Sequence, residues 1–326
     1  MRRRDFISLL GGVPIVRPVN VRAQSPTIPV VGVLHSQTRE TEASRLIAIQ
    51  QGLGDVGFVV GRNVLFEHRY AEGQNARLPA LAAELVERRV NVILANTTPP
   101  AIAAKAATTT IPIVFVTGVD PVEVGLVASV NRPGANVTGV TFLSNKLVAK
   151  RLELLCDVIP AHVPIGMLAA EHNPNTATDI RDTQAAADAL RRVLHVEKVS
   201  PKGDIDAPLM RLQQQRIGAL FVAPQADFRL WRPPILKFAT QHKLPTSFGS
   251  SDQVVGGGLM SYGPDQIDSY REAGVYTGRV LKGEKPATLP VLIATKFEFA
   301  VNLKTAKALG VTLPPSLLVL ATNVIE

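Results

Sequence analysis

The chain has 326 residues, of which 46% are hydrophobic and 19% are charged, a length sufficient for two ordinary domains. Half of its formal charge of +8 comes from residues 1–23, and the remaining residues carry 30 basic against 26 acidic side chains without a Lys/Arg cluster. This balance argues against a nucleic-acid partner. The single cysteine, Cys156, excludes an intramolecular disulfide.

The first 23 residues have the layout of an export signal. Three arginines at positions 2–4 precede an apolar run over residues 7–16. That run is too short to span a bilayer, which takes about 20 apolar residues. The order Arg-Arg-Asp-Phe resembles the twin-arginine type of signal, which exports folded proteins. We expect residues 1–23 to be removed and the mature protein to be periplasmic; the alternative is a basic, disordered N-terminus.

Apolar runs rich in β-branched residues alternate with amphipathic segments along the rest of the chain. This alternation predicts an α/β fold with mainly parallel sheets. Ten strands are more than a single open sheet usually holds, so we expect two doubly wound lobes. The predicted strands are residues 29–34, 63–70, 90–95, 111–116, 137–143, 164–170, 194–199, 217–223, 244–249 and 258–263.

The division between the lobes is predicted from turn and capping residues. A turn at residues 132–134 precedes the fifth strand, and Ser144 can cap the helix that follows it. We therefore expect the chain to enter the second lobe after residue 143 and to return later. The first lobe is predicted as residues 27–143 plus 258–288, and the second as residues 144–257 plus 289–326.

A glycine pattern in the first lobe imitates a dinucleotide-binding motif. Gly52, Gly54 and Gly57 satisfy GxGxxG, but they follow a helical pattern and precede a strand, the reverse of the order that motif requires. We interpret the segment as the C-terminal end of a helix, where glycine supplies the left-handed conformation.

Polar residues that precede prolines follow three of the predicted strands. Thr98, Asp120 and Asn173 each combine a capping side chain with a proline suited to the first helical position. Each alone is an ordinary cap, but strand-to-helix turns in parallel sheets share the carboxyl edge, where ligands bind. Their repetition in both halves predicts an anion-binding cleft. His35 and Ser36, after the first strand, would join it, although a solvated loop explains His35 equally well.

Motifs for common catalytic chemistries are absent from the sequence. No GxSxG elbow, P-loop, HExxH or paired-cysteine motif occurs, and the histidines form no helical i, i+4 pair. We expect no metal, no cofactor and no catalytic residue. A catalytic triad dispersed along the chain stays open, because triads are defined by geometry and not by order.

The stretch TTTIPIVFVTGVDPVEVGLVASVNRPGANVTGVTFLSN, with the later GGLMSYG, RVLKGEKPATLPV and KFEFAVNLKTAKALGVTLPPSLL, resembles a known family. These segments are similar to ABC-transporter substrate-binding proteins, including tryptophan- and phenylalanine-binding members. The resemblance implies a type I periplasmic-binding fold, in which two lobes are joined by three crossover segments. We expect the crossovers near residues 142–144, 257–259 and 288–290.

The resemblance also implies a ligand site at the strand ends. It predicts ligand contacts by His35, Ser36, Thr97, Thr98, Thr117, Asp120, Asn173, Asn175 and Asp252. Two segments depart from the family pattern. A turn that is usually glycine-rich reads Asn96-Thr97 here, and the segment after the 217–223 strand reads PQADFRLW where the family commonly carries an Asp and a Ser.

These observations together predict a periplasmic solute receptor that is not an enzyme. We expect a monomer that captures a small carboxylate-bearing molecule, an amino acid or aromatic acid, by hinge closure and delivers it to an ABC permease of the inner membrane. Ser36, Thr98 and Asn175 are expected to bind ligand oxygens, and Asp120 an ammonium group. Two alternatives remain: a sensor that presents its ligand to a signalling receptor, and an exported hydrolase.

Overall fold

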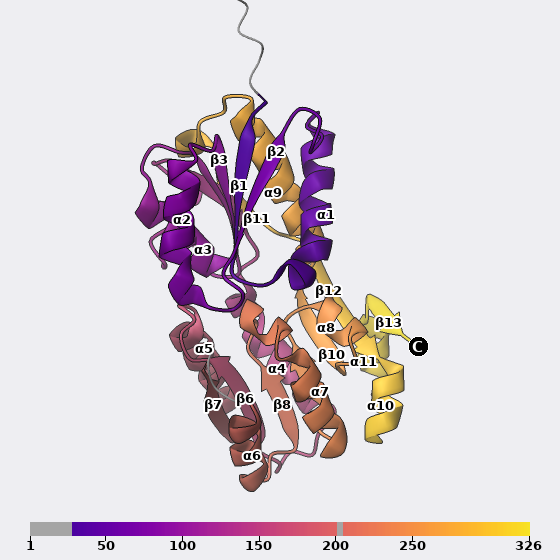
Figure 1. The fold of residues 1–326 in the computed structure, drawn as a ribbon. Coiled ribbons are helices and arrows are strands. Elements are labelled where there is room, and N and C mark those ends of the chain that lie inside the picture. The colour runs from indigo at the N-terminus through magenta and orange to yellow at the C-terminus, as the bar shows by residue number, and fades with distance from the viewer. Residues whose placement is uncertain (1–27, 201–204) are drawn as a thin grey trace, which may run out of the picture.

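The computed structural model describes residues 28–200 and 205–326, which form two α/β lobes, one above the other in Figure 1. The predicted export signal lies outside the described residues. Each lobe is built around its own sheet, and the two-lobed α/β architecture predicted from the sequence is confirmed. No helix within the described ranges combines the length and the hydrophobicity needed to cross a membrane.

The first lobe holds a six-stranded sheet in the order β11-β5-β4-β3-β1-β2, and its paired strands are parallel. The parallel arrangement places the carboxyl ends of these strands along one edge, which faces the second lobe (Figure 1). The strands are β1 (Val30–His35), β2 (Leu65–Tyr70), β3 (Val92–Asn96), β4 (Ile113–Thr117), β5 (Val137–Thr141) and β11 (Leu292–Ile293).

Both faces of this sheet are covered by helices, which explains why its strands read as continuous apolar runs. In β3, Val92 and Leu94 pack on one side, whereas Ile93 and Ala95 pack on the other. Helices α1 and α9 cover the first side, and α2 and α3 cover the second (Figure 1). These helices are α1 (Arg39–Asp55), α2 (Leu78–Glu87), α3 (Thr98–Ala107) and α9 (Gln266–Leu281).

The second lobe holds a seven-stranded sheet in the order β13-β12-β10-β9-β8-β6-β7. Its pairs are parallel except β10 with β12. The strands are β6 (Ile165–Ala170), β7 (Leu194–Val199), β8 (Ala219–Val222), β9 (Thr246–Phe248), β10 (Met260–Pro264), β12 (Phe297–Asn302) and β13 (Asn323–Ile325).

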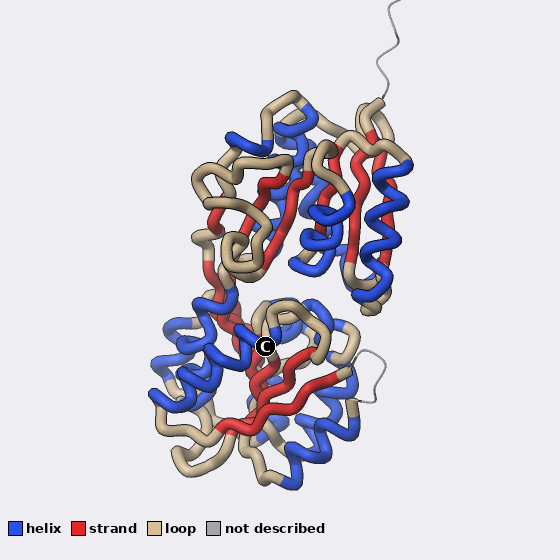
Figure 2. Tube along the Cα trace, turned by 90° about the vertical axis from the view of Figure 1, so that its left-hand side faces the viewer, coloured by secondary structure: helices blue, strands red, loops and turns tan. Residues whose placement is uncertain are grey.

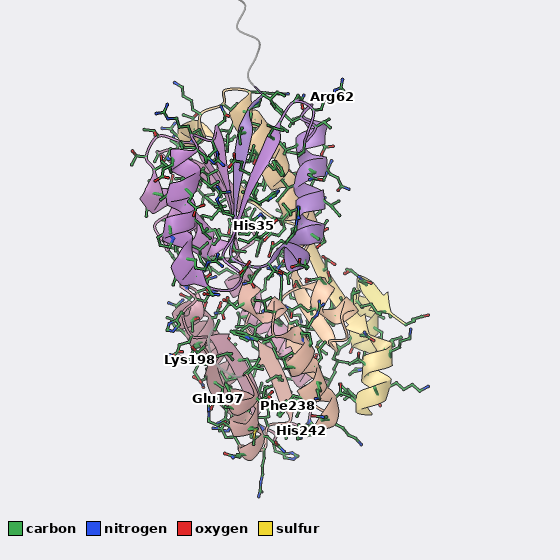
Figure 3. The ribbon with its side chains drawn as sticks, in the orientation of Figure 1. His35, Arg62, Glu197, Lys198, Phe238 and His242 are labelled. Carbon is green, nitrogen blue, oxygen red and sulfur yellow. The ribbon has the colours of Figure 1, made fainter. Side chains whose placement is uncertain are left out.

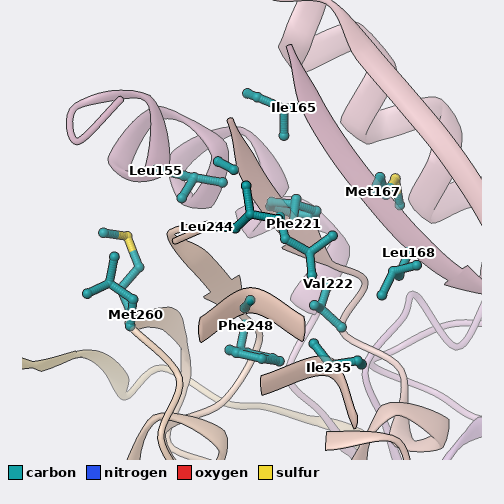
Figure 4. Packing of buried hydrophobic residues seen from close by; sticks show 14 of the residues in the cluster. Leu155, Ile165, Met167, Leu168, Phe221, Val222, Ile235, Leu244, Phe248 and Met260 are labelled. Carbon is teal, nitrogen blue, oxygen red and sulfur yellow. The ribbon is translucent and has the colours of Figure 1, made fainter. Parts of the chain in front are cut away.

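Helices surround this second sheet and enclose one continuous apolar core, part of which Figure 4 shows. In that view Phe221 of β8 lies among side chains from neighbouring strands and helices, and Phe248 of β9 lies lower in the picture, beyond Val222. The helices are α4 (Val148–Cys156), α5 (Thr176–Ala189), α6 (Asp206–Gln214), α7 (Arg232–Gln241), α8 (Ser251–Val255), α10 (Leu303–Leu309) and α11 (Pro315–Leu320).

The chain passes between the lobes at three places, and Figure 2 shows the backbone segments that connect them. The first crossover follows β5. The other two differ from the predicted boundaries, because β10 pairs with β9 and β12 in the second sheet, whereas β11 pairs with β5 in the first. Residues 260–264 therefore belong with the second lobe and residues 292–293 with the first.

The sequence located the strands better than the helix starts. Each of the ten predicted runs overlaps an observed strand, whereas the short edge strands β11 and β13 were not predicted. No helix follows Asp120: its Oδ1 accepts a hydrogen bond from the Val122 N–H (2.9 Å) within a turn. Helix α5 begins at Thr176, after the Asn173-Pro174 pair that was expected to start it.

Candidate functional site

A pocket lies between the two lobes, at the carboxyl ends of their strands. It holds about 440 Å³ of space not filled by atoms, part of it open to solvent. Both lobes and one crossover contribute to its wall. The lining residues are Ser36, Thr97, Thr98, Pro99, Gly118, Phe142, Asn173, Asn175, Pro224, Gln225, Ala226, Asp227, Arg229, Gln266 and Tyr270.

The first lobe presents hydroxyl groups to this pocket from the ends of β1 and β3. Ser36 Oγ lies 3.1 Å from Thr97 Oγ1, and Thr98 Oγ1 lies 2.7 Å from Thr117 Oγ1. Thr117 is fully buried behind Thr98 and fixes the orientation of its hydroxyl. These groups are neutral hydrogen-bond donors and acceptors that suit oxygen atoms of a small ligand.

Thr97 has a backbone conformation that is almost restricted to glycine. Its φ of 101° and ψ of 169° fall where a side chain clashes with the backbone. Glycine would adopt this conformation without strain. Here the strained residue places a hydroxyl in the pocket, where it meets Ser36. Strain of this kind costs about 1–3 kcal/mol and persists only where the surroundings enforce it.

The second lobe presents amide and carboxyl groups from the loops after β6 and β8. Asn173 Nδ2 donates to Asp227 Oδ2 (2.7 Å), and both residues are buried. Burial raises the pKa of Asp227, while the Asn173 bond opposes that rise. Across the cleft, Asn175 Nδ2 lies 3.4 Å from Thr98 Oγ1, so the two walls touch at this point.

Charged residues beside the pocket also join the lobes. Glu42 of α1 pairs with Arg229 of the second lobe (3.4 Å), and Arg45 of α1 pairs with Asp252 of α8 (3.3 Å). Gln266, the first residue of α9, accepts hydrogen bonds from both arginines through its Oε1 (3.1 Å each). The lobes are therefore in contact around the pocket in this structure.

His35 lies behind the pocket, inside the first lobe, where Figure 3 shows it toward the second lobe. Asn96 Nδ2 lies 3.2 Å from its Nδ1 and also donates to Glu42 Oε2 (2.5 Å). His35 Nε2 lies 3.1 Å from His68 Nδ1. Burial, with a smaller effect of His68, lowers the pKa of His35 to about 3, so the imidazole is neutral near pH 7. This chain of hydrogen bonds supports Glu42 and does not reach the ligand space.

The nine residues predicted to bind ligand fall into two groups. Those that line the pocket are Ser36, Thr97, Thr98, Asn173 and Asn175. Those that do not line it are His35, Thr117, Asp120 and Asp252. In the second group Asp252 forms the inter-lobe pair with Arg45 and Asp120 belongs to a turn.

Several pocket residues were missed by the sequence reasoning. Gln225, Asp227 and Arg229 come from PQADFRLW, the segment noted only as a departure from the family pattern. The signal was present: a polar segment directly after a buried parallel strand belongs at the ligand edge. Tyr270 lies inside α9, and nothing in its local pattern indicates a pocket.

A buried carboxyl group that is hydrogen-bonded to Gln225 of the pocket wall gives the stability a predictable pH dependence. Burial raises the pKa of Asp179 to about 7, whereas hydrogen bonding from Gln225 and the nearby Arg151 charge oppose the rise. Between pH 4 and 7 the folded chain thus holds a proton that the unfolded chain has released. The contribution of Asp179 to stability is complete below its unfolded pKa and is lost as pH rises, by at most about 1.4 kcal/mol per unit.

Asp179→Asn should remove this contribution. We expect the stability of the native sequence to fall relative to that of the variant as pH rises from 4.5 to 6.5, because only the carboxyl group titrates. Urea unfolding of both proteins across this range measures the difference. Parallel pH profiles would show that Asp179 does not hold a proton in the folded state.

Metal-ligating side chains do not gather anywhere in the part of the chain that the structure describes. No group of three or more His, Cys, Asp or Glu residues lies close enough there to hold a metal ion. The pocket wall instead combines hydroxyl, amide, carboxyl and guanidinium groups. This set can bind a small polar molecule through hydrogen bonds and charge.

Solved structures with the same architecture come from several bacteria. An ABC domain from Streptococcus pneumonia, in complex with L-Trp, is 26% identical, with a TM-score of 0.82 over 91% of this chain and 99% of that one. A conserved domain protein from Vibrio cholerae is 25% identical, with a TM-score of 0.85 over the same shares. A ligand-free, open substrate-binding protein from Clostridium difficile, at 23% identity and a TM-score of 0.64 over 92% and 99%, shares the fold.

A family model accounts for nearly all of the described chain. A search of curated proteins found no match to this chain. The model described as ABC transporter substrate binding protein matches residues 31–325, which include both lobes and all three crossovers. The chain therefore belongs to the ABC transporter substrate-binding protein family.

Proposed function

We propose that this chain is the solute receptor of an ABC importer and binds a small carboxylate-bearing molecule, an amino acid or aromatic acid. The observation that carries the proposal is the pocket between the lobes, whose polar groups come from both of them. The L-Trp complex of the Streptococcus structure supports an amino-acid ligand. Residues 1–23 would direct export, and the mature receptor would work as a monomer in the periplasm and deliver its ligand to an inner-membrane permease.

The polar groups of the pocket suit the two charges of an amino acid. Ser36, Thr98 and Asn175 would donate to the carboxylate, together with the N-terminal end of α3. Asp227 would accept from the ammonium group, since it is a buried carboxyl group with no cation within ion-pair distance among the described residues. We assign this role to Asp227 in place of Asp120, which lies outside the pocket.

Hinge closure would couple binding to transport. A ligand held by one lobe gains further bonds when the other lobe closes over it, and this differential affinity shifts the population from open to closed. Micromolar binding supplies about 8 kcal/mol. Moving the closed state from 1% to 99% takes about 5.5 kcal/mol of preference, which such a ligand can provide.

The first test is a search for the ligand itself. Native mass spectrometry of the gently purified protein should reveal a small molecule carried through purification. A thermal-shift screen of amino acids and aromatic acids should show saturable stabilisation, because a ligand that binds only the folded state raises its apparent stability. Turnover of a compound without stable binding would contradict a receptor function.

Thr98→Ala should weaken binding of the ligand found in this way by about 10-fold, the value of one hydrogen bond to a charged group. Thr109→Ala is the matched control, since Thr109 is exposed in the turn that follows α3 and does not line the pocket. Isothermal titration of both variants measures the difference. Unchanged affinity in a Thr98→Ala protein of normal stability would remove Thr98 from the ligand site.

A further inference from the structure

Arg229 is the cation in the pocket wall. It ends the short turn Ala226–Arg229 after β8, and it is the only Lys or Arg among the residues that line the pocket. Its side chain is only 8% exposed. A guanidinium group keeps its charge when buried, so the surroundings must supply acceptors for its N–H groups.

The acceptors present do not satisfy this guanidinium. Arg229 Nη1 donates to Glu42 Oε1 at 3.4 Å, a long bond, and Nη2 donates to Gln266 Oε1 at 3.1 Å. Nε is buried and has no hydrogen-bond partner in the part of the chain that the structure describes. A buried donor without an acceptor is costly, and this donor belongs to a residue that faces a cavity.

Glu42 does not compensate fully, because it is shared. Its other oxygen, Oε2, accepts from Asn96 Nδ2, and the residue is 1% exposed inside the first lobe. Glu42 thus holds Arg229 from behind while the guanidinium still has free N–H groups for a partner in the pocket. A carboxylate can accept two parallel N–H bonds from a guanidinium, a strong and geometrically selective interaction.

We propose that Arg229 determines the specificity of the pocket by binding an anionic oxygen of the ligand. The inference rests on the proposed receptor function and deepens it: the pocket selects acids and rejects the matching neutral amides. The selectivity arises in the second lobe, so the ligand acid group would help to draw the lobes together. Removing the ligand charge would leave the guanidinium without its acceptor.

The experiment compares acids with their own carboxamides. A panel of amino acids and aromatic acids, each paired with its carboxamide, is titrated against the native protein. We expect every binding acid to bind at least 10-fold more tightly than its amide, the difference that a charge-assisted bond makes. Amides that bind as tightly as acids would overturn the role of Arg229 and leave the receptor function standing. Absence of binding by every member would instead count against the receptor function itself.

Three variants separate ligand recognition from lobe closure. Arg229→Gln should reduce the preference for the acid to about threefold or less, whereas Arg229→Lys should keep part of it. Glu42→Gln removes the ion pair between the lobes and keeps Arg229 in the pocket wall, so acid binding should persist with its preference over the amide intact. Arg232→Gln removes a nearby charge outside the pocket and should leave the preference unchanged.

The results for the Glu42 and Arg229 variants decide whether Arg229 recognises the ligand or only joins the lobes. If Arg229 served only to join the lobes, Arg229→Gln and Glu42→Gln would weaken acid and amide equally, and the proposal would be wrong. Thermal unfolding of each variant checks that it is folded. Should Arg229→Gln fail to fold, a reduced acid preference in Arg229→Lys supports the proposal, and an unchanged preference there contradicts it.

Discussion

Gly52→Ala is expected to destabilise the folded chain by about 3 kcal/mol, although it adds a single methyl group to a helix. A Cβ at this position would lie 1.8 Å from the carbonyl oxygen of Arg271 in α9. The approach is mutual, since a Cβ at Gly274 of α9 would lie 2.2 Å from the carbonyl oxygen of Ile49 in α1. Backbone cannot move aside as a side chain can, so the two helices would have to separate.

Gly54→Ala is the matched control, two residues along the same helix. Nothing lies within 4 Å of a Cβ there, and the residue is exposed. Alanine favours a helix over glycine by about 1 kcal/mol, so this variant should be more stable than the native protein. Urea unfolding of both variants should give changes of opposite sign. A common sign would contradict the close helix crossing.

Arg151→Ala is expected to destabilise the folded chain by about 4 kcal/mol, because it removes the largest fully buried side chain among the described residues and the two hydrogen bonds that it donates. Arg151 Nε donates to the carbonyl oxygen of Tyr262 (3.1 Å) and Nη2 to that of Ser144 (3.0 Å). These carbonyls lie beside the first and second crossovers. The guanidinium also lies over the ring of Phe221, with Cζ 5.5 Å from its centroid.

Arg151→Met tests which part of this loss comes from the empty volume. Burial lowers the pKa of Arg151 to about 10, a sign that the charge is poorly compensated. Methionine fills much of the space and removes that charge, so we expect a smaller loss of about 2 kcal/mol. Chemical unfolding measures both variants. A cost below 1 kcal/mol for Arg151→Ala would contradict a structural role for this side chain.

The fold was predictable because buried parallel strands leave a plain pattern in the sequence. Residues such as Val92, Ile93 and Leu94 are all apolar since helices cover both faces of the sheet. The boundaries between the lobes were harder to predict from the sequence. The amino-acid composition does not change on either side of β10, and β11 is only two residues long. Only the observed pairing with neighbouring strands therefore assigns each of them to its sheet.

The candidate site was predictable where it follows strand ends and not elsewhere. Ser36, Thr98 and Asn175 come from turns after parallel strands and line the pocket. Arg229 and Gln266 meet Glu42 and Arg45 across distances of up to 221 residues in sequence, and no local pattern indicates such pairs. Asp252 was predicted as a ligand residue from the same kind of turn, yet it lies outside the pocket and pairs with Arg45.

The three crossovers have a consequence for the order in which the protein can fold during synthesis. The first sheet acquires α9 and its edge strand β11 only from residues 266–293, which the ribosome delivers after most of the second sheet. Until then Val33, Leu94 and Val116 lack one of the two helices that cover their side of the sheet. Neither lobe is a contiguous fragment, so the nascent chain must remain incomplete in both lobes until nearly all of it has emerged.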